Sequence, residues 1–207
     1  MSSFAAKAAA LPPDATRPAD DATAALVAAL RTEIAGLKAR LAEAEAAADL
    51  DPLTPVSNRR AFARALHRIA AYSGRYGAPA SLVYFDLDDL KAINDRHGHA
   101  VGDAALHAVA ERLSRNVRES DVVGRMGGDE FAVVLAHADL RVAEAKAAAL
   151  AALIERTPVQ YGDVTLRLSV SYGLRQIDPS ADPETLIAEA DAQMFARKRT
   201  RKTRAAG

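Results

Sequence analysis

The first regular pattern along the chain is a heptad repeat of apolar positions within residues 23–50. Apolar residues recur seven apart in two interleaved series, Val27, Ile34, Leu41 and Ala48, and Leu30, Leu37 and Ala44. In a parallel pair of helices, Glu33 would face Lys38 and Arg40 would face Glu45, with opposite charges both times. The pattern predicts a coiled-coil helix that joins two copies of the chain. The alternative is a single amphipathic helix that packs on its own domain.

Residues on either side of this helix predict the rest of the domain organisation. Residues 1–22 are rich in Ala, Pro and Asp, a composition typical of a disordered tail. Pro52 and Pro55 end or kink the helix, because proline removes a backbone donor and restricts the residue before it. We therefore expect the folded domain to occupy residues 51–203.

Within residues 51–203, the spacing of apolar residues alternates between helical and strand periods. A helix with Phe62, Leu66, Ile69 and Tyr72 on one face follows a cap at Ser57 or Asn58 and closes at Gly74 and Gly77. Further along, the pattern predicts a strand at 81–85, helices at about 102–116, 140–156 and 183–200, and two hairpins, at 121–135 and 158–170. This order indicates an α+β domain whose sheet is covered by helices.

Composition narrows the classes of protein that the chain can belong to. The 207 residues suffice for one domain and an appendage, and 27 basic residues balance 27 acidic ones. Net charge therefore gives no argument for nucleic acid or a membrane as partner. The absence of Cys excludes disulfides, zinc–thiolate sites and thiol catalysis. Since no apolar run reaches the roughly 18–20 residues of a membrane span and no signal peptide is evident, we expect a soluble cytoplasmic protein.

The candidate chemistry lies at the turn of the first hairpin, in the stretch from Arg125 to Phe131. Gly127 and Gly128 occupy the turn, and Asp129 and Glu130 follow it directly. A hairpin does not require two adjacent carboxylates, which repel each other, and a divalent cation would remove that conflict. The alternative is a polar turn. Asp86 ends the buried strand 81–85, which is a common place for a ligand site, although simple capping of the strand end would also explain it.

If these two strands are neighbours, Asp86 and Asp129 lie close together. Two carboxylates can hold one or two Mg²⁺ ions whose shells are completed by substrate phosphates, the usual arrangement in nucleotide chemistry. The sequence therefore favours an enzyme that acts on nucleotides.

Five motifs in this order resemble the GGDEF family of diguanylate cyclases. They are the signature Gly127-Gly128-Asp129-Glu130-Phe131, the segments 51–60, 85–95 and 98–103, and the segment 190–195. The resemblance covers about residues 51–200. It implies a nucleotidyl-cyclase-like α+β domain with a central, mainly antiparallel sheet, in which two GTP molecules are joined into cyclic di-GMP with release of two pyrophosphates.

The resemblance also implies roles for individual residues. Asp86 and Asp129, with the carbonyl of Leu87, correspond to the ligands of Mg²⁺, for which Mn²⁺ is an alternative. Glu130 corresponds to the acidic residue needed for catalysis. The remaining substrate contacts would be Asn94 and Asp103 for guanine, Lys91, Lys198 and Lys202 for phosphates, and Gly127 and Gly128, which let the nucleotide approach the backbone. Asp103 favours GTP, because family members that accept ATP have a small neutral residue there.

Arg118 and Asp121 form an Arg-x-x-Asp motif just ahead of the signature. In the family this motif binds the product and inhibits the enzyme, and an Arg fork with a carboxylate suits phosphate and guanine edges. The alternative is an i,i+3 ion pair at a helix end. We therefore expect cyclic di-GMP to be both product and inhibitor.

Some positions depart from the family pattern, namely Pro55, Asp89, Leu90, Arg197, Arg201 and Lys202. None of them removes a metal ligand or Glu130. Arg201 and Lys202 put one phosphate contact in doubt, although Lys202 keeps the charge. Two other functions remain open: a module that binds cyclic di-GMP through Arg118 and Asp121 without making it, and a helical adaptor whose domain mediates assembly.

Overall fold

The computed structural model describes residues 17–47 and 49–205, which form two units divided after Ala47. The first unit contains helix α1 (Arg17–Ala47), which begins six residues before the predicted coiled-coil segment. The side chains of Val27, Leu30, Ile34 and Leu37 are between 41 and 55% exposed. Residues 1–16 of the predicted tail are not among the residues that the structure describes. The same holds for the side chains of residues 17–22 and of the heptad positions Leu41, Ala44 and Ala48. Pairing of α1 with a second copy therefore stays a prediction.

The second unit contains a five-stranded sheet, a separate two-stranded hairpin and five helices among the described residues. In chain order its elements are β1 (Ser57–Asn58), α2 (Arg59–Tyr76), β2 (Ala80–Leu87), α3 (Leu90–His97), α4 (His99–Arg115), β3 (Val122–Gly127), β4 (Glu130–Ala136), α5 (Leu140–Arg156), β5 (Val159–Tyr161), β6 (Val164–Leu166), β7 (Val170–Gln176) and α6 (Pro183–Ala205). None of the described helices is long and apolar enough to span a membrane.

The main sheet has the strand order β1-β3-β4-β2-β7. The short strand β1 runs parallel to β3, and every other pair in this sheet is antiparallel. The prediction of a mainly antiparallel sheet is therefore confirmed. The pairing of β2 with β4 also confirms that the two strands carrying Asp86 and the signature are neighbours.

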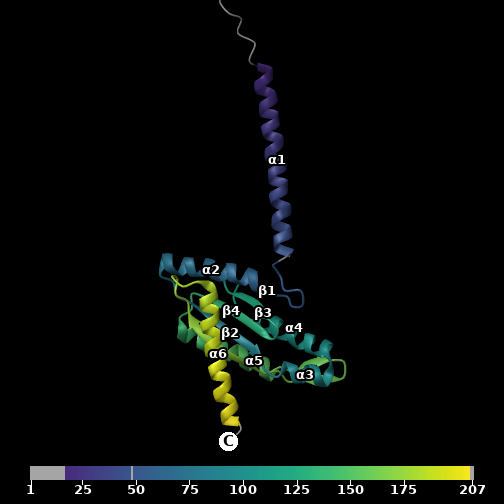
Figure 1. The fold of residues 1–207 in the computed structure, drawn as a ribbon, viewed down its shortest axis with the longest axis vertical. Coiled ribbons are helices and arrows are strands. Elements are labelled where there is room, and N and C mark those ends of the chain that lie inside the picture. Colours follow the sequence, from purple (N-terminus) through teal and green to yellow (C-terminus); the bar gives the residue numbers. More distant parts are fainter. Residues whose placement is uncertain (1–16, 48, 206–207) are drawn as a thin grey trace, which may run out of the picture. The chain divides into compact units, whose positions relative to one another are not determined.

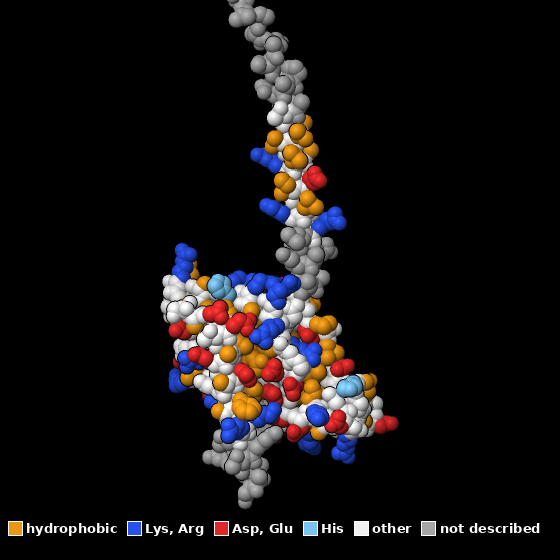
Figure 2. All heavy atoms as spheres, in the orientation of Figure 1, with side chains coloured by type: hydrophobic (Ala, Val, Ile, Leu, Met, Phe, Trp, Pro, Cys, Tyr) orange, Lys and Arg blue, Asp and Glu red, His pale blue; other side chains and the backbone are white. Residues whose placement is uncertain are grey.

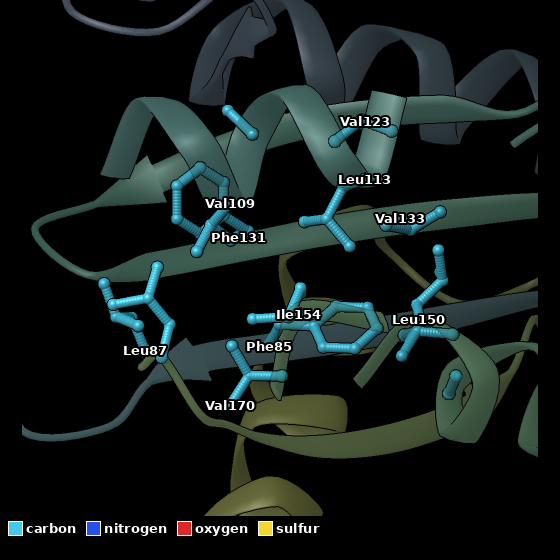
Figure 3. Close-up of a cluster of buried hydrophobic side chains, with 14 of the residues drawn as sticks. Phe85, Leu87, Val109, Leu113, Val123, Phe131, Val133, Leu150, Ile154 and Val170 are labelled. Carbon is cyan, nitrogen blue, oxygen red and sulfur yellow. The ribbon is translucent and has the colours of Figure 1, made fainter. Parts of the chain in front are cut away.

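Helices cover both faces of this sheet, as Figure 1 shows. Successive side chains of a strand point to opposite faces, so Val83, Phe85 and Leu87 of β2 belong to one apolar cluster. Leu82 and Tyr84 of the same strand belong to the other. The first cluster, part of which is drawn in Figure 3, includes side chains of α4 and α5, and the second includes side chains of α2 and α6. Because both faces are buried, the central strands are almost continuously apolar.

The helix boundaries follow from local signals that the sequence contains. Asn58 accepts a hydrogen bond from the backbone N–H of Ala61 and so caps α2, and Gly77 ends this helix in the left-handed conformation. Asp182 accepts from the backbone N–H of Glu184 at the start of α6. Helix α5 spans the predicted residues 140–156, with Asp139 as its cap.

The structure corrects the predicted hairpin at residues 158–170. The strands β5 and β6 do pair, but β6 ends at Leu166, and Val170 begins a different strand, β7, which joins the main sheet beside β2. The sequence prediction missed β7, as it missed β1 and the separate helix α3. Helix α4 also begins at His99, ahead of the expected residue 102.

Gly173 explains why β7 lacks a clear strand pattern. A Cβ atom at this position would lie 2.2 Å from the backbone nitrogen of Met194 and 2.4 Å from the carbonyl oxygen of Ala190, both in α6. Glycine ordinarily weakens a strand, but here it lets the helix backbone lie directly against the sheet. This close approach fixes α6 over β7 and next to β2.

Candidate functional site

Strand register places three ionisable side chains on the face of the sheet that α6 covers. Tyr84 and Asp86 are two residues apart in β2, so they point to the same face. Asp86 pairs directly with Glu130 across the antiparallel ladder, which puts Glu130 on that face as well. Acidic side chains gather on the domain surface seen in Figure 2, with basic side chains along α2 at its edge.

Asp86 is charge-compensated by Lys198 of α6. The Lys198 ammonium forms an ion pair with the Asp86 carboxylate and lies 3.5 Å from Oδ1 of Asp88. Burial raises the pKa of Asp86, the hydrogen bond and charge of Lys198 oppose that rise, and the carboxylates of Asp129 and Asp88 add to it. Lys198 itself loses hydration on burial, yet its two carboxylate partners hold its pKa above the usual value.

The buried carboxylate of Asp88 lies next to the Asp86–Lys198 ion pair. Its carboxylate accepts hydrogen bonds from the hydroxyl of Ser169, at 3.0 Å, and from that of Ser171, at 2.9 Å. Its backbone N–H donates to the carbonyl of Ser169. Both serines come from the segment around the start of β7, so Asp88 is fixed by a strand that the sequence did not predict.

Glu130 occupies a strongly acidic environment. Burial raises its pKa, a hydrogen bond from the Tyr84 hydroxyl opposes the rise, and the charges of Asp191, Asp129 and Asp86 add to it. Burial and the neighbouring Glu130 charge likewise raise the pKa of Tyr84 well above its usual value. A carboxyl group whose pKa is raised is a better proton acceptor near neutral pH than an ordinary one.

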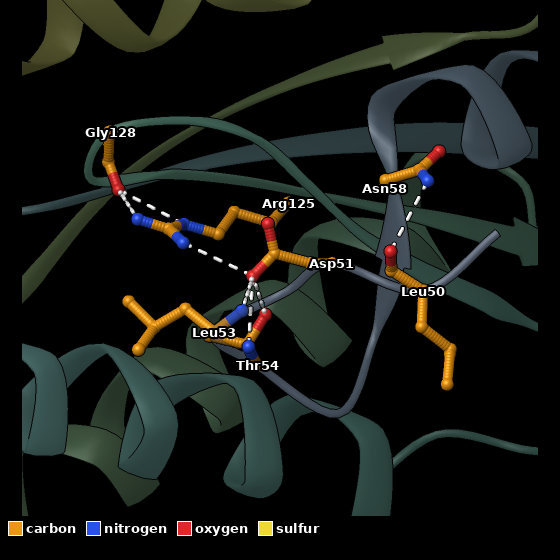
Figure 4. A network of polar contacts seen from close by, with 7 residues as sticks. All are labelled: Leu50, Asp51, Leu53, Thr54, Asn58, Arg125 and Gly128. Atoms are coloured by element: carbon orange, nitrogen blue, oxygen red, sulfur yellow. Dashed lines mark hydrogen bonds and ion pairs between the residues drawn. The ribbon is translucent and has the colours of Figure 1, made fainter. Parts of the chain in front are cut away.

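The turn that carries Asp129 is held by a polar network that reaches the start of the domain (Figure 4). Arg125 donates from Nη2 and Nε to the carbonyl oxygen of Gly128, at 2.7 and 3.1 Å, and from Nη1 to Oδ1 of Asp51, at 3.1 Å. The same Asp51 oxygen accepts from the backbone N–H groups of Leu53 and Thr54 and from the Thr54 hydroxyl.

This network stabilises the ionised form of Asp51. Burial opposes ionisation, but hydrogen bonds from Thr54 and Arg125 outweigh it and hold the pKa of Asp51 below its ordinary value. Both members of the Arg125–Asp51 pair are only 13% exposed. The signature turn is therefore anchored to the segment that follows residue 48, and the backbone carbonyl of Asp129 accepts in turn from the N–H of Leu87.

The residues of this site fit a divalent cation of the Mg²⁺ type. Two carboxylates, Asp86 and Asp129, and the backbone at Leu87 offer the hard oxygen donors that Mg²⁺ prefers. Their mutual repulsion helps to raise the pKa of Asp86, so additional positive charge would stabilise the group. Among the residues that the structure describes, no three His, Cys, Asp or Glu side chains form a metal cluster. A cation here would therefore need substrate or water oxygens as well.

The predicted guanine-binding residues lie on the adjoining helices α3 and α4, which meet at Gly98. Asn94 comes from α3, and its side-chain oxygen Oδ1 is buried without a hydrogen-bond partner in the structure. A buried acceptor left unpaired costs about 1–3 kcal/mol, so a donor on a ligand would satisfy it. Asp103 is exposed on α4, one residue beyond Gly102, against which the Asn94 amide packs. Lys91 is exposed on α3.

The basic residues of α6 occupy different environments. Lys198 contacts the carboxylates, whereas Arg197 forms a two-pronged ion pair with Glu144 of α5, at 2.8 and 3.1 Å. Glu144 also accepts from the Tyr172 hydroxyl, and the Arg197 guanidinium lies over the Tyr172 ring. Arg197, which departs from the family pattern, thus links α6 to α5 and β7. The side chain of Lys202 lies outside the described residues.

Arg118 and Asp121 lie just before β3, at the end of the signature hairpin that is away from its turn. The Asp121 carboxylate accepts from the backbone N–H of Arg118 and from that of Ala136, at 2.9 and 3.0 Å. The alternative of an i,i+3 ion pair is thus replaced by a side chain-to-backbone contact. The exposed Arg118 side chain lines a pocket together with Asp121, Val142 and Lys146.

Three residues of the site were missed by the sequence prediction, namely Tyr84, Asp88 and Asp191. Tyr84 and Asp191 act on Glu130 from β2 and α6, and Asp88 acts on Lys198. Tyr84 lies two residues before Asp86 in a strand, and period-two spacing could have indicated its position. The contributions of Asp88 and Asp191 depend on how β7 and α6 pack.

We predict that Glu130→Gln stabilises the ligand-free protein at neutral pH. A carboxyl group with a raised pKa favours folding when protonated, so its stabilising contribution is complete below the ordinary value of 4.5 and is lost as pH rises through the folded-state pKa. Glutamine carries no charge and avoids this loss. Thermal unfolding with a chelator present should show a variant advantage that grows from about pH 4 to pH 7. Glu155→Gln, at an exposed position, is the control, and an advantage that does not change with pH would contradict the prediction.

Comparisons with known proteins agree on one family. Residues 48–204 match the family described as "Diguanylate cyclase, GGDEF domain". The chain is 35% identical over 156 residues to the diguanylate cyclase DosC of Escherichia coli, and 37% identical over 182 residues to the diguanylate cyclase TpbB of Pseudomonas aeruginosa. These alignments cover 75 and 83% of the chain but only 34 and 41% of the relatives. The chain thus spans well under half the length of these curated relatives.

Solved structures show the same fold. The structure of the coiled coil and GGDEF domain of DgcB from Caulobacter crescentus, in complex with c-di-GMP, has a TM-score of 0.74 at 25% identity and covers 86% of this chain and 95% of that one. The GGDEF domain of TpbB from Pseudomonas aeruginosa has a TM-score of 0.69 at 36% identity and covers 73% of this chain and 89% of that one.

Proposed function

We propose that this chain, which belongs to the GGDEF family of diguanylate cyclases, condenses two GTP molecules into cyclic di-GMP and two pyrophosphates. The observation that carries the proposal is a cluster of three carboxylates: Asp86 and Glu130 lie on the face of the sheet covered by α6, and the charge of Asp129, in the adjoining turn, acts on both. Lys198 pairs with Asp86. The family match and the two relatives named as diguanylate cyclases support the same activity.

Each residue of the cluster has a part in the proposed reaction. Asp86 and Asp129, with the Leu87 carbonyl, would hold Mg²⁺, which polarises phosphate oxygens when it is bound. Glu130 accepts the proton of a ribose 3′-hydroxyl, and its raised pKa suits that task. The 3′-oxygen forms a bond to the α-phosphorus of the second GTP, the bond between that phosphorus and the bridging oxygen breaks, and pyrophosphate leaves. A second such step closes the ring.

Substrate recognition rests on α3 and α4. Asn94 and Asp103 would read the guanine edge, since a carboxylate can accept from its N1–H and N2–H groups and an amide can address the remaining polar atoms. The unpartnered Oδ1 of Asn94 supports a ligand contact there. Lys91, Lys198 and Lys202 would contact phosphates, Lys198 by exchanging one of its carboxylate partners for a phosphate oxygen.

Catalysis as proposed needs two domains, because one domain binds one GTP and cannot present both substrates face to face. The apolar stripe of α1, which comprises the heptad positions from Val27 to Leu37, would supply the pairing as a parallel coiled coil. The alignment with the DgcB structure that includes the coiled coil covers 86% of this chain. The alignment with the DgcB GGDEF domain alone covers 74% of it. The additional coverage supports a corresponding helical segment here.

The test is to incubate the purified protein with GTP and Mg²⁺ and to follow pyrophosphate and nucleotide products over time. Formation of cyclic di-GMP with two pyrophosphates for each product molecule would support the proposal. Tight binding of cyclic di-GMP without any pyrophosphate would instead make the protein a receptor that acts through Arg118 and Asp121. Absence of both would leave a role in assembly.

We predict that Arg118→Ala weakens product inhibition. The guanidinium lines the pocket beside Asp121 and would bind the product, so its loss should weaken inhibition by cyclic di-GMP about tenfold or more while the initial rate stays unchanged. Initial rates at increasing added cyclic di-GMP measure the effect. Arg115→Ala, which removes a neighbouring arginine paired with Glu111, is the matched control. Equal inhibition of all three proteins would contradict the assignment of this pocket.

A further inference from the structure

Gly102 is an unusual residue for its position. It is buried in the first turns of α4, where glycine is less favourable than alanine by about 1 kcal/mol. Its backbone is helical, so a turn or a left-handed conformation does not explain it. A reason for its presence must therefore come from what lies against it.

The neighbour of Gly102 is the side-chain amide of Asn94. A Cβ atom built on Gly102 would lie 1.9 Å from Oδ1 of Asn94, 2.9 Å from its Cγ and 3.4 Å from its Nδ2. Real Cβ atoms do not approach other atoms within 3.0 Å, so the amide can occupy this position only because residue 102 has no side chain. All of the atoms named belong to the end of one side chain, which can rotate away without moving the backbone.

The connection between α3 and α4 creates this contact. Gly98 lies between the helices with φ of 86°, and its N–H donates to the carbonyl of Asn94 while its own carbonyl accepts from Val101 and Gly102. Asn94 is thereby brought onto the first turns of α4, against Gly102. In this position Oδ1 of Asn94 is buried.

We propose that Gly102 is a positioning residue for guanine recognition: it provides the space in which the Asn94 amide is held. The inference rests on the proposed function, because it assumes that Asn94 reads the base. An alanine at position 102 displaces the Asn94 side chain from the position in which it would meet the base. The enzyme then loses affinity for guanine nucleotides while its fold and its carboxylate cluster are retained.

The experiment is a double-mutant cycle on GTP binding, measured by calorimetry with a non-hydrolysable GTP analogue and with the matching ATP analogue. Asn94→Ala should weaken binding of the GTP analogue about 10- to 150-fold, the effect of one lost polar contact. Gly102→Ala should weaken it to a similar degree, and the two together no more than Asn94→Ala alone, because without the amide no collision remains. Discrimination against the ATP analogue should fall in parallel.

Two controls separate positioning from damage to the fold. Gly102→Ala should keep or raise the melting temperature, since alanine favours a helix. Gly36→Ala is the matched helical control, because a Cβ there meets no atom within 4 Å, and it should leave nucleotide binding unchanged.

The outcomes distinguish failure of the inference from failure of the proposed function. If Asn94→Ala weakens the GTP analogue and Gly102→Ala does not, the positioning role is wrong and the guanine site stands. If the two effects simply add, Gly102 acts through something other than Asn94, and the inference is equally overturned. If Asn94→Ala itself has no effect, the guanine contact fails, and the inference fails with it.

Discussion

Replacement of Asp129 by Asn should lower GTP turnover about a thousandfold or more. The change removes one carboxylate charge from the site that would hold the cation, and several kcal/mol of transition-state stabilisation depend on that charge. Each 1.36 kcal/mol corresponds to a tenfold change in rate, so about 4 kcal/mol gives this factor. Turnover is measured as pyrophosphate released from saturating GTP and Mg²⁺.

The position of Asp129 makes this substitution a selective one. Its side chain lies on the turn that Arg125 anchors through the Gly128 carbonyl, and its backbone carbonyl accepts from Leu87. Asparagine preserves both backbone contacts, so the turn and the fold should survive. Asp163→Asn makes the same chemical change in the exposed β5–β6 turn and is the matched control.

Two further measurements test whether Asp129→Asn acts on the cation site alone. The melting temperature of Asp129→Asn should not fall, because removing one charge from an acidic cluster relieves the repulsion that raises the pKa values of Asp86 and Glu130. Binding of cyclic di-GMP at the Arg118 pocket should also persist. Turnover equal to that of the Asp163→Asn control would overturn the assignment of Asp129 as a metal ligand.

The layers of the fold follow from periodicity, because the central strands are buried on both faces and helices such as α2 and α5 have an apolar face. Asn58, Gly77 and Asp182 mark helix boundaries by local chemistry that the sequence shows directly. Strand β7 is different, since Gly173 interrupts it for a reason that lies in α6. A two-residue strand such as β1 has no period to detect.

The sequence predicts the site residues that belong to motifs, but it does not predict the contacts between residues far apart in the chain. Asp86 and Asp129 stand out because carboxylates directly follow an apolar strand or a glycine turn. The contact between Asp51 and Arg125 joins residues 74 positions apart, and that between Asp86 and Lys198 joins residues 112 apart. Such pairs depend on strand register and helix packing, which a single sequence does not state. For the same reason the pairing of Lys198 with Asp86 and Asp88 could not be predicted, and the phosphate contact that the resemblance implies for Lys198 stays a prediction.

Substitution of Ile34 by Asp should separate the proposed dimer and remove most of the activity at low protein concentration. Ile34 is half exposed on α1 at the centre of the apolar stripe, and a charge there would be buried between paired helices at a cost of several kcal/mol. A tether gives the second domain an effective concentration of about 1 mM, so at micromolar enzyme its loss should lower the rate roughly a hundredfold or more.

The concentration dependence and a neighbouring control make this prediction specific. Specific activity of Ile34→Asp should rise with protein concentration, whereas that of the parent should stay constant, and sedimentation should show a monomer and a dimer, respectively. Ala35→Asp introduces the same charge one residue on, outside the stripe, and should remain an active dimer.

Orientation of the two helices can be tested on the same segment. Glu33→Lys places like charges opposite each other in a parallel pair and should weaken the dimer, and adding Lys38→Glu should restore it. In the alternative, α1 is an amphipathic helix that packs on its own domain. Ile34→Asp would then lower the melting temperature of a protein that is monomeric throughout, with the same activity per molecule at every concentration. In that case the two GTP molecules would be brought together when free domains collide in solution, and not within a tethered dimer.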